Sequence, residues 1–406
     1  MRASLIVSLA FRNLTRNVRR TLITSAAVIA GVSVLIMGFG LVDGLDENVI
    51  RAQEDTSSGH VLLRPAEFPS DNLNYPLDKA APIEASLAAA LTDERIEAYA
   101  TRLWFSARMV SGMDSVRMKV IGYRAEAEAA VFPRETWTVA GAWPTEDGQI
   151  AMGAGLASML ELSAGDSVVL NAHTMAGAIN ALPYQITGIV TAGSPAVDAM
   201  SVWMPMENAV RLVEPGEART HIAVRLKRRG LSDGIIPELS VGGWTAQSSL
   251  QEVADLIALN AFRRQAISLV VLILMLISAL GIANTVIMAT YERVREVGTL
   301  RAMGMSRRGI QSLFLLEGGV MGLTAGVLGA GVGCAVVWWF ASHGIDISGL
   351  TNSLGETSMS STLYMQFTWG PVIFSLVFGF VVSILSSAYP AWHASTLNPA
   401  DAVKAD

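Results

Sequence analysis

The sequence predicts a helical membrane protein with four transmembrane helices and a large α+β extracytoplasmic domain between the first and second of them. Hydrophobic residues make up 51% of the 406 residues, and the mean hydropathy is +0.43. Charged residues make up only 16%, whereas about a quarter of an average globular chain is charged. The apolar residues form four long runs near the two ends, and the middle of the chain is mixed in composition. This distribution favours a membrane protein with a folded insertion over an ordinary soluble protein.

The first element is a basic segment followed by an apolar run. Residues 1–20 contain five arginines and no acid, which predicts an amphipathic helix on the cytoplasmic face of the membrane. Residues 21–41 contain no charge, and this length is enough to cross a bilayer once. A cleavable signal peptide is the alternative, but its apolar core is usually about 7–15 residues long and precedes an A-x-A site. The run here is longer and lacks such a site, so we expect an uncleaved first transmembrane helix.

Residues 42–264 have the pattern of a folded α+β domain, in which short β-like runs alternate with turn residues. Strands are predicted at His60–Leu63, Val116–Ile121, Ser167–Leu170, Tyr184–Val190, Ser201–Met204 and Thr220–Leu226. Helices are predicted at Pro82–Leu91, Gly155–Leu160, Glu207–Val213 and Gln251–Arg264. The alanine-rich stretch Ile83–Ala100 suggests a longer surface helix, and residues 227–249 are expected to lead back toward the membrane.

Three further apolar runs, each long enough to span a bilayer, follow at residues 265–290, 310–341 and 367–389. A polar loop at residues 342–366 separates the last two runs, and residues 390–406 form a short tail. The run at 310–341 contains glycines at four-residue spacing, which favours close packing of membrane helices over ligand binding. These glycines are Gly318, Gly322 and Gly326.

The charged segment at residues 291–309 sets the topology. It contains five arginines, as do residues 1–20, whereas residues 342–366 contain neither Lys nor Arg. By the positive-inside rule, both termini and the 291–309 segment lie in the cytoplasm, and the large domain lies outside. Glu292 and Glu296 recur at helical spacing. We therefore expect a cytoplasmic helix against which a partner protein can push.

The sequence contains no recognisable catalytic or cofactor motif. It has no G-x-x-x-x-G-K-[ST] loop and no G-x-S-x-G elbow, and its five histidines lack the spacing of a metal site. We expect no catalytic residue, metal, cofactor or nucleic acid on this chain. Glu317 is the one acid within the predicted spans, and pairing with Arg307 or Arg308 is favoured over a transport role. Without a relay of acids across the membrane, any transport would need energy from a partner.

Four motifs, in order along the chain, resemble those of a known family. They are LAFRNL at residues 9–14, GAGLA and GDSV within 153–168, YERVREVGTLRAMG at 291–304, and YPA with NPADA within 389–402. Together they resemble the FtsX-like permeases, the membrane subunits of the MacB/LolCDE/FtsX class of ABC transporters. The sequence contains no ATPase motif, and its outer domain is large. Within this class it therefore most resembles the lipoprotein-releasing LolC/LolE permeases.

The resemblance implies a non-catalytic permease subunit in the bacterial inner membrane, with its MacB-like core domain in the periplasm. ATP and Mg²⁺ would be bound by a dimer of a separate cytoplasmic ABC ATPase, and a second copy or a homologous permease would complete the complex among membrane lipids. Hydrolysis would drive extraction of lipoproteins or other amphiphilic cargo toward the outer membrane. FtsX-like mechanical regulation of a periplasmic partner and MacB-like efflux are the alternatives.

The resemblance also assigns candidate sites. The residues of the coupling helix that would contact the ATPase are Glu292, Arg293, Glu296, Gly298, Arg301 and Gly304. The alternative is that these charges only solvate a cytoplasmic loop and set the topology. In the outer domain, Thr174–Leu182 lies where LolC/LolE-type permeases bind a periplasmic carrier, and its candidate contact residues are Thr174, Met175, Ile179 and Leu182. This apolar stretch is equally compatible with a plain hairpin connection.

Overall fold

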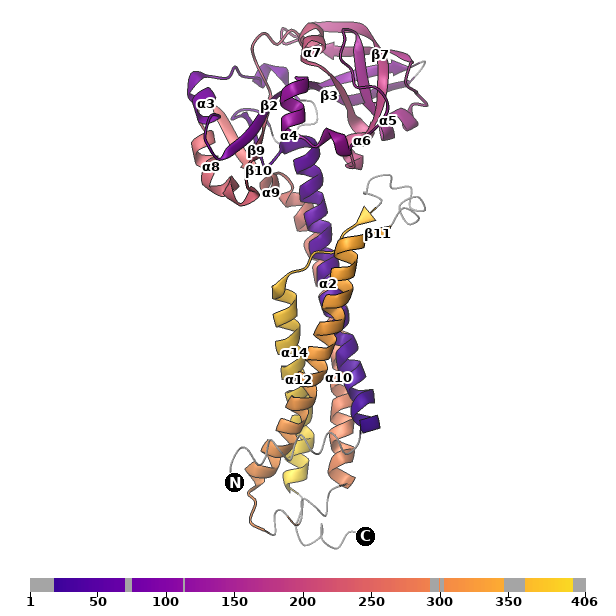
Figure 1. The fold of residues 1–406 in the computed structure, drawn as a ribbon, viewed down its shortest axis with the longest axis vertical. Helices are drawn as coiled ribbons and strands as arrows, with labels where there is room; N and C mark the ends of the chain where they lie inside the picture. Colours follow the sequence, from indigo (N-terminus) through magenta and orange to yellow (C-terminus); the bar gives the residue numbers. More distant parts are fainter. Residues whose placement is uncertain are drawn as a thin grey trace. The chain divides into compact units, whose positions relative to one another are not determined.

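The computed structural model of the chain describes residues 18–69, 75–111, 114–292, 303–346 and 362–396, together with Thr299. The chain divides into two compact units (Figure 1). One unit contains the long helices. The other, made of Asn48–Ile257 with Asp346–Leu363, contains the α+β domain.

The long helices contain the apolar runs of the sequence. They are α2 (Val18–Gln53), α10 (Ala254–Glu292), α12 (Arg307–His343) and α14 (Trp369–Thr396). Within the described residues, the segments that are long and apolar enough to cross a membrane are Val28–Ser58, Arg307–His343 and Trp369–His393. The predicted second span, residues 265–290, lies inside α10 but is not among these three. The count of four transmembrane helices therefore stays a prediction.

Helix α12 approaches α14 closely at its glycines. A Cβ atom added to Gly318 would lie 1.9 Å from Ser387 Oγ, and one added to Gly322 would lie 2.3 Å from Ser383 Oγ. At Gly326 the added atom would make an ordinary contact of 3.5 Å. The first two of the three glycines therefore lie at points where no larger side chain fits between the helices.

The next turns of α12 pack against α2. A Cβ atom added to Gly329 would lie 2.7 Å from the carbonyl oxygen of Ile29, and Ser33 Oγ donates a hydrogen bond to the carbonyl of Gly329 at 2.9 Å. Around this contact, Val32 and Leu35 are buried in an apolar core that α2, α12 and α14 share. Small residues thus bring three helices of this unit into direct contact.

Ten strands of the described chain join in one sheet in the α+β unit. They are β1 (Val61–Pro65), β2 (Ile96–Ser111), β3 (Asp114–Tyr123), β4 (Thr138–Gly141), β5 (Gln149–Gly153), β6 (Ser167–His173), β7 (Ile179–Thr191), β8 (Ser201–Pro205), β9 (His221–Leu226) and β10 (Trp244–Ser248). Their order is β10-β1-β9-β2-β3-β8-β5-β7-β4, and β6 pairs with both β7 and β2. Because β6 connects β7 back to β2, the strands β2, β3, β8, β5, β7 and β6 close into a barrel. Strands β9, β1 and β10 extend from β2 as an open antiparallel sheet.

Strand β2 belongs to both the open sheet and the barrel. From Ile96 to Arg102 it pairs with β9, and from Leu103 to Ser111 it pairs with β3. Alternate residues of a strand point to opposite faces. Those that point into the barrel core are Leu103, Phe105, Ala107 and Met109. This one strand therefore fixes the register of both layers.

Short helices cover the two layers. Helices α3 (Ala85–Ala90) and α8 (Ser232–Leu239) pack on the open sheet, and their Leu87 and Leu239 are buried in its core. The other short helices are α4 (Ala125–Val131), α5 (Ala154–Met159), α6 (Pro195–Met200), α7 (Met206–Val213) and α9 (Ser249–Glu252). Of these, α5 and α7 contribute buried residues to the barrel core.

The predicted α+β class of this domain is confirmed, and all six predicted strands overlap observed strands. Two predictions within the domain are wrong. Ile83–Ala100 is not one helix, because α3 ends at Ala90 and β2 begins at Ile96, where pairing with β9 outweighs the helix propensity of the alanines. Residues 227–249 do not merely lead toward the membrane, because they form α8 and β10, which pairs with β1.

Candidate functional site

Basic side chains lie in a row on the outer face of the barrel. Strands β2 and β3 turn alternate residues inward, so Ala107 and Met118 are buried whereas Arg108 and Arg117 are exposed. The two arginines are direct cross-strand neighbours. Like charges opposite each other destabilise a sheet. This pair places two guanidinium groups beside each other on the outer face of the barrel.

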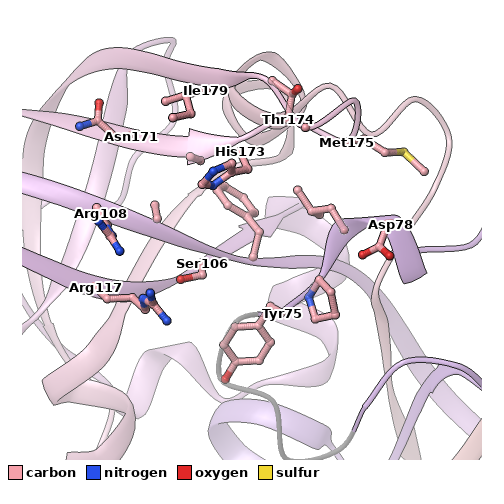
Figure 2. Close-up of a pocket in the computed structure, with 16 residues that line it drawn as sticks. Tyr75, Asp78, Ser106, Arg108, Arg117, Asn171, His173, Thr174, Met175 and Ile179 are labelled. Carbon is pink, nitrogen blue, oxygen red and sulfur yellow. The ribbon is translucent and has the colours of Figure 1, made fainter.

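The two arginines border a cleft of about 790 Å³ in the α+β unit. Figure 2 shows Arg108 and Arg117 in this cleft, with His173 of β6 nearby. Tyr75 also lines it, and burial raises the pKa of this phenol, which keeps it a neutral hydroxyl. Asp78 is the one acid among the lining residues. The cleft is therefore electropositive and suited to anionic or polar groups.

The hairpin of β6 and β7 borders this cleft and contains the predicted partner loop. Strand β6 continues to His173 and β7 begins at Ile179, where these two residues pair. The connection is therefore 174–178 and not 174–182. Leu182 is not a loop residue, because it lies in β7 and packs against the barrel core.

The tip of this hairpin is tightly closed. The backbone N–H of Thr174 donates to the carbonyl of Ala178 at 2.7 Å, and the N–H of Ala178 donates to Thr174 Oγ1 at 3.1 Å. Thr174 is buried, whereas Met175 is 39% exposed and Ile179 is 72% exposed. Thr174 therefore shapes the turn, whereas Met175 and Ile179 present apolar surface beside the cleft.

A buried arginine holds the end of helix α2 inside the α+β unit. After its α-helical part, α2 continues into one π-helical turn, η1 (Glu54–Ser58). Arg102 Nη1 donates to the carbonyls of Thr56 and Ser57, both at 3.0 Å, and its other nitrogens bind the Glu128 carboxylate. Both side chains of the ion pair are fully buried. Removing one partner would leave a buried charge, so this joint resists distortion.

Two further contacts hold the same turn. Glu54 accepts a hydrogen bond from Ser249 Oγ at 2.6 Å and pairs with Arg229 at 2.9 Å. Gly59, which ends the turn, has a φ of +63°, and a Cβ atom there would lie 2.6 Å from the carbonyl oxygen of Val224. Only glycine fits this position.

The predicted coupling residues lie partly outside the described chain. Glu292 is the last residue of α10. Those outside the described residues are Arg293, Glu296, Gly298 and Arg301. The backbone N–H of Met303 donates to the carbonyl of Thr299 at 2.9 Å, which is the spacing of one α-helical turn. Gly304 follows with a φ of +92°, a conformation that favours glycine and commonly ends a helix.

The sequence already contained a signal for the basic row. In V-R-M-K-V at residues 116–120, apolar and basic residues alternate, which places Arg117 and Lys119 on one face of a strand. Arg102 and Glu128 had no such signal, since only the fold brings them together.

Among the described residues, no three His, Cys, Asp or Glu side chains converge as a metal site requires.

Comparison with known proteins assigns both parts of the chain to families. A model of the MacB-like periplasmic core domain matches residues 21–234, and a model of the FtsX-like permease C-terminal domain matches residues 268–399. The lipoprotein-releasing system transmembrane protein LolC of Xylella fastidiosa (strain 9a5c) is 21% identical over 63% of this chain and 64% of its own length. The macrolide export ATP-binding/permease protein MacB of Hyphomonas neptunium is 24% identical over 98% of this chain and 60% of its own length.

Among solved structures, the periplasmic region of MacB from Actinobacillus actinomycetemcomitans aligns with 49% of this chain and 93% of its own, at 11% identity and a TM-score of 0.34. The chain spans less than two thirds of the length of both curated relatives. The periplasmic-core model alone covers more than half of the 406 residues. The chain therefore belongs to the family of membrane permeases that combine a MacB-like periplasmic core domain with an FtsX-like permease C-terminal domain.

Proposed function

We propose that this chain is the permease subunit of an ABC transporter and couples ATP hydrolysis by a separate cytoplasmic ATPase dimer to movement of its outer domain. The joint at the end of α2 is the observation that supports this most directly. The candidate span Val28–Ser58 ends in the turn that Arg102 holds. A displacement of the helix would therefore act on buried residues of the domain and not on a loose linker.

The energy source in this proposal lies on a partner. The printed sequence has no phosphate-binding loop, so ATP and Mg²⁺ would be bound by the ATPase. Its contact surface on this chain is proposed to be the coupling helix, with Glu292 and Glu296 among the contact residues. A second copy of the chain or a homologous permease completes the proposed assembly in the inner membrane.

We further propose that the stroke extracts lipoproteins or other amphiphilic cargo from the inner membrane. The similarity to LolC supports this cargo class. The exposed Met175 and Ile179 beside the electropositive cleft offer a mixed surface to which a lipoprotein or a periplasmic carrier can bind. Efflux is the second candidate, because the similarity to MacB extends over 98% of the chain.

Co-purification of the full chain from its own membrane tests the proposal. We expect an ABC ATPase together with a lipidated protein or its carrier in the detergent-solubilised complex. An outer-membrane channel in place of the lipidated protein would support efflux, and a cell-wall hydrolase would support FtsX-like regulation. If no ATPase accompanies the chain, the transporter assignment is wrong.

A charge-reversal variant tests the coupling helix. Glu292→Lys combined with Glu296→Lys should abolish association with the ATPase, because the variant places two cations where the partner is expected to present complementary charge. The matched control is Glu94→Lys with Glu135→Lys, which reverses two exposed carboxylates of the outer domain. Membrane insertion of both variants, checked by fractionation, should equal that of the wild type. Retained ATPase in the first variant would rule out the assigned contact.

A further inference from the structure

A second, smaller pocket of about 380 Å³ lies in the α+β unit and has an aromatic wall. The rings of Trp104 and His221 stack with their centroids 3.8 Å apart, and Phe68 meets His221 edge-on at 5.0 Å. Tyr75 meets Trp104 edge-on at 6.1 Å. These four rings come from different parts of the chain, and the fold arranges them around one space.

The charges in this pocket do not cancel. Arg64 is neutralised by Glu252 at 3.0 Å and also donates to Gln247. Lys119 Nζ lies 3.1 Å from the centroid of the Trp104 ring. In the part of the chain that the structure describes, the Lys119 ammonium makes no ion pair and no hydrogen bond. Among the described lining residues the basic side chains therefore outnumber the one carboxylate, Glu252, and the Trp104 ring faces the Lys119 ammonium.

Two buried polar atoms of the pocket lack partners. Trp104 is 5% exposed and His221 is 3% exposed, and neither Trp104 Nε1 nor His221 Nδ1 has a hydrogen-bond partner among the described residues. Buried polar atoms in folded proteins are nearly always paired, because an unpaired one costs about 1–3 kcal/mol. Both side chains line this pocket, beside the Lys119 ammonium.

We propose that this pocket binds a small organic anion with an apolar or planar portion. A carboxylate or phosphate group of this ligand would accept from the Lys119 ammonium. Its apolar portion would pack against the aromatic wall and against Leu62 and Val197, which also line the pocket. The site is separate from the proposed ATPase contact and from the hairpin tip, and it does not depend on the transported cargo.

The proposal predicts that binding depends on the charge of the ligand. The full chain in phosphatidylcholine nanodiscs is titrated with phenylbutyrate and, separately, with its neutral amide phenylbutyramide, by equilibrium dialysis. Phenylbutyrate should bind at least about tenfold more tightly, because a charge-assisted hydrogen bond contributes more than a neutral one. Equal affinity for acid and amide, or no saturable binding of the acid up to millimolar concentration, would overturn the proposal.

Substitutions in the pocket test whether phenylbutyrate binds there. Lys119→Met keeps the apolar stem and removes the ammonium, so it should weaken phenylbutyrate binding about tenfold or more while leaving phenylbutyramide unchanged. The matched control is Lys227→Met, on an exposed lysine away from the pocket, which should change neither. Ala196→Trp, at an exposed pocket-lining position of α6, fills the space without disturbing the core and should abolish binding of both probes. If both pocket variants melt like the wild type and still bind phenylbutyrate normally, the site is not this pocket.

The pH dependence of phenylbutyrate binding tests the role of Lys119 independently of the variants. Burial, and then the neighbouring charge of Arg102, lowers the pKa of Lys119. An anion beside the ammonium would raise that pKa, so binding should take up a proton and weaken as pH rises. The other titratable and charged groups around Lys119 are Arg64, Arg102, Arg117, His221, Tyr75 and Glu252. Titration calorimetry in two buffers of different ionisation enthalpy measures the proton uptake, and a pH-independent affinity would contradict the role of Lys119.

An organic anion that binds in this pocket can be an acidic membrane lipid or a soluble molecule. Replacing part of the phosphatidylcholine by phosphatidylglycerol should compete with phenylbutyrate if the natural ligand is an acidic lipid. If the ligand is a soluble anion, the affinity for phenylbutyrate should stay the same in both nanodiscs.

Discussion

Asp198 titrates far from the ordinary range of a carboxyl, because burial raises its pKa to about 6. The residue is 6% exposed, and the backbone N–H of Ala192 donates to its Oδ1 at 2.8 Å. That hydrogen bond lowers the pKa but does not offset the burial. Asp198 therefore keeps a proton in the folded state at a pH where the unfolded chain has already lost it.

The sign of the resulting pH dependence follows from proton counting. Between about pH 4 and pH 6 the folded state binds more protons at Asp198 than the unfolded state, so this residue lowers stability as pH rises through that window. Asp198→Asn keeps the acceptor for Ala192 and removes the titration. We expect the variant to be more stable than the wild type by about 1–2 kcal/mol at pH 8, after allowance for solvent screening, and equal to it near pH 4. Denaturant unfolding of the detergent-solubilised chain at the two pH values measures this difference, and a gap that does not change with pH would refute it.

Residue-level features differ in how far the sequence reveals them. The common face of Arg117 and Lys119 follows from local alternation. The stacking of Trp104 on His221 joins residues from β2 and β9, and no local pattern predicts which strand lies beside which. The same reason explains why the pocket at Lys119 was not predicted from sequence.

At the level of elements, the contact between α12 and α14 depends on the absence of side chains at Gly318 and Gly322. The atoms that meet them are the hydroxyls of Ser387 and Ser383. Both serines satisfy their hydroxyls within α14, because each donates to the carbonyl four residues earlier. The two helices therefore touch without leaving a polar group unpaired in an apolar environment.

Filling this contact should separate the helices. In Gly322→Leu the new side chain would overlap Ser383, and overpacking of this kind costs about 1–3 kcal/mol. Gly331→Leu is the matched control on the same helix, since a Cβ atom there meets nothing within 4 Å. Thermal unfolding of the detergent-solubilised variants should show a lower Tm for the first and an unchanged Tm for the second. Equal Tm values would mean that the contact does not contribute to stability.

Elements with a strong local pattern were the ones that the sequence predicted. The long apolar helices and the six alternating strands are of this kind. Strand β2 (Ile96–Ser111) was not among the predicted strands, and its first residues, Ile96–Ala100, were assigned to an alanine-rich helix although they pair with β9. The hairpin connection was predicted too long, because Ile179–Leu182 were assigned to it although they pair with β6.

At the level of the whole chain, helix α2 is followed directly by the turn η1, which belongs to the α+β unit. This turn is bound by Arg102, which in turn binds Glu128 of α4. Hydrogen bonds to buried groups thus join this turn to two elements of the α+β unit, β2 and α4. The proposed transport stroke needs such a joint.

Substitutions of Arg102 and Glu128 should distinguish the contribution of this joint to stability from its contribution to transport. Arg102→Met alone leaves Glu128 buried and unpaired and should cost about 3–5 kcal/mol, whereas Arg102→Met with Glu128→Leu should recover most of that loss. The double variant still lacks the bonds to Thr56 and Ser57. In proteoliposomes with the ATPase, we expect it to hydrolyse ATP at the wild-type rate but to release cargo several-fold more slowly. Wild-type release by a stable double variant would show that the stroke takes another route.

The shared strand β2 also limits how this domain can change in evolution. Because the open sheet and the barrel both contain it, neither half is a module with its own ends. A chimera that takes the barrel from one relative and the open sheet from another has to join the two relatives within strand β2, where pairing with β9 changes to pairing with β3. An insertion of one residue between Arg102 and Leu103 would turn the core-facing side chains of one half toward solvent. Recombination between relatives is therefore expected to exchange the whole outer domain or none of it.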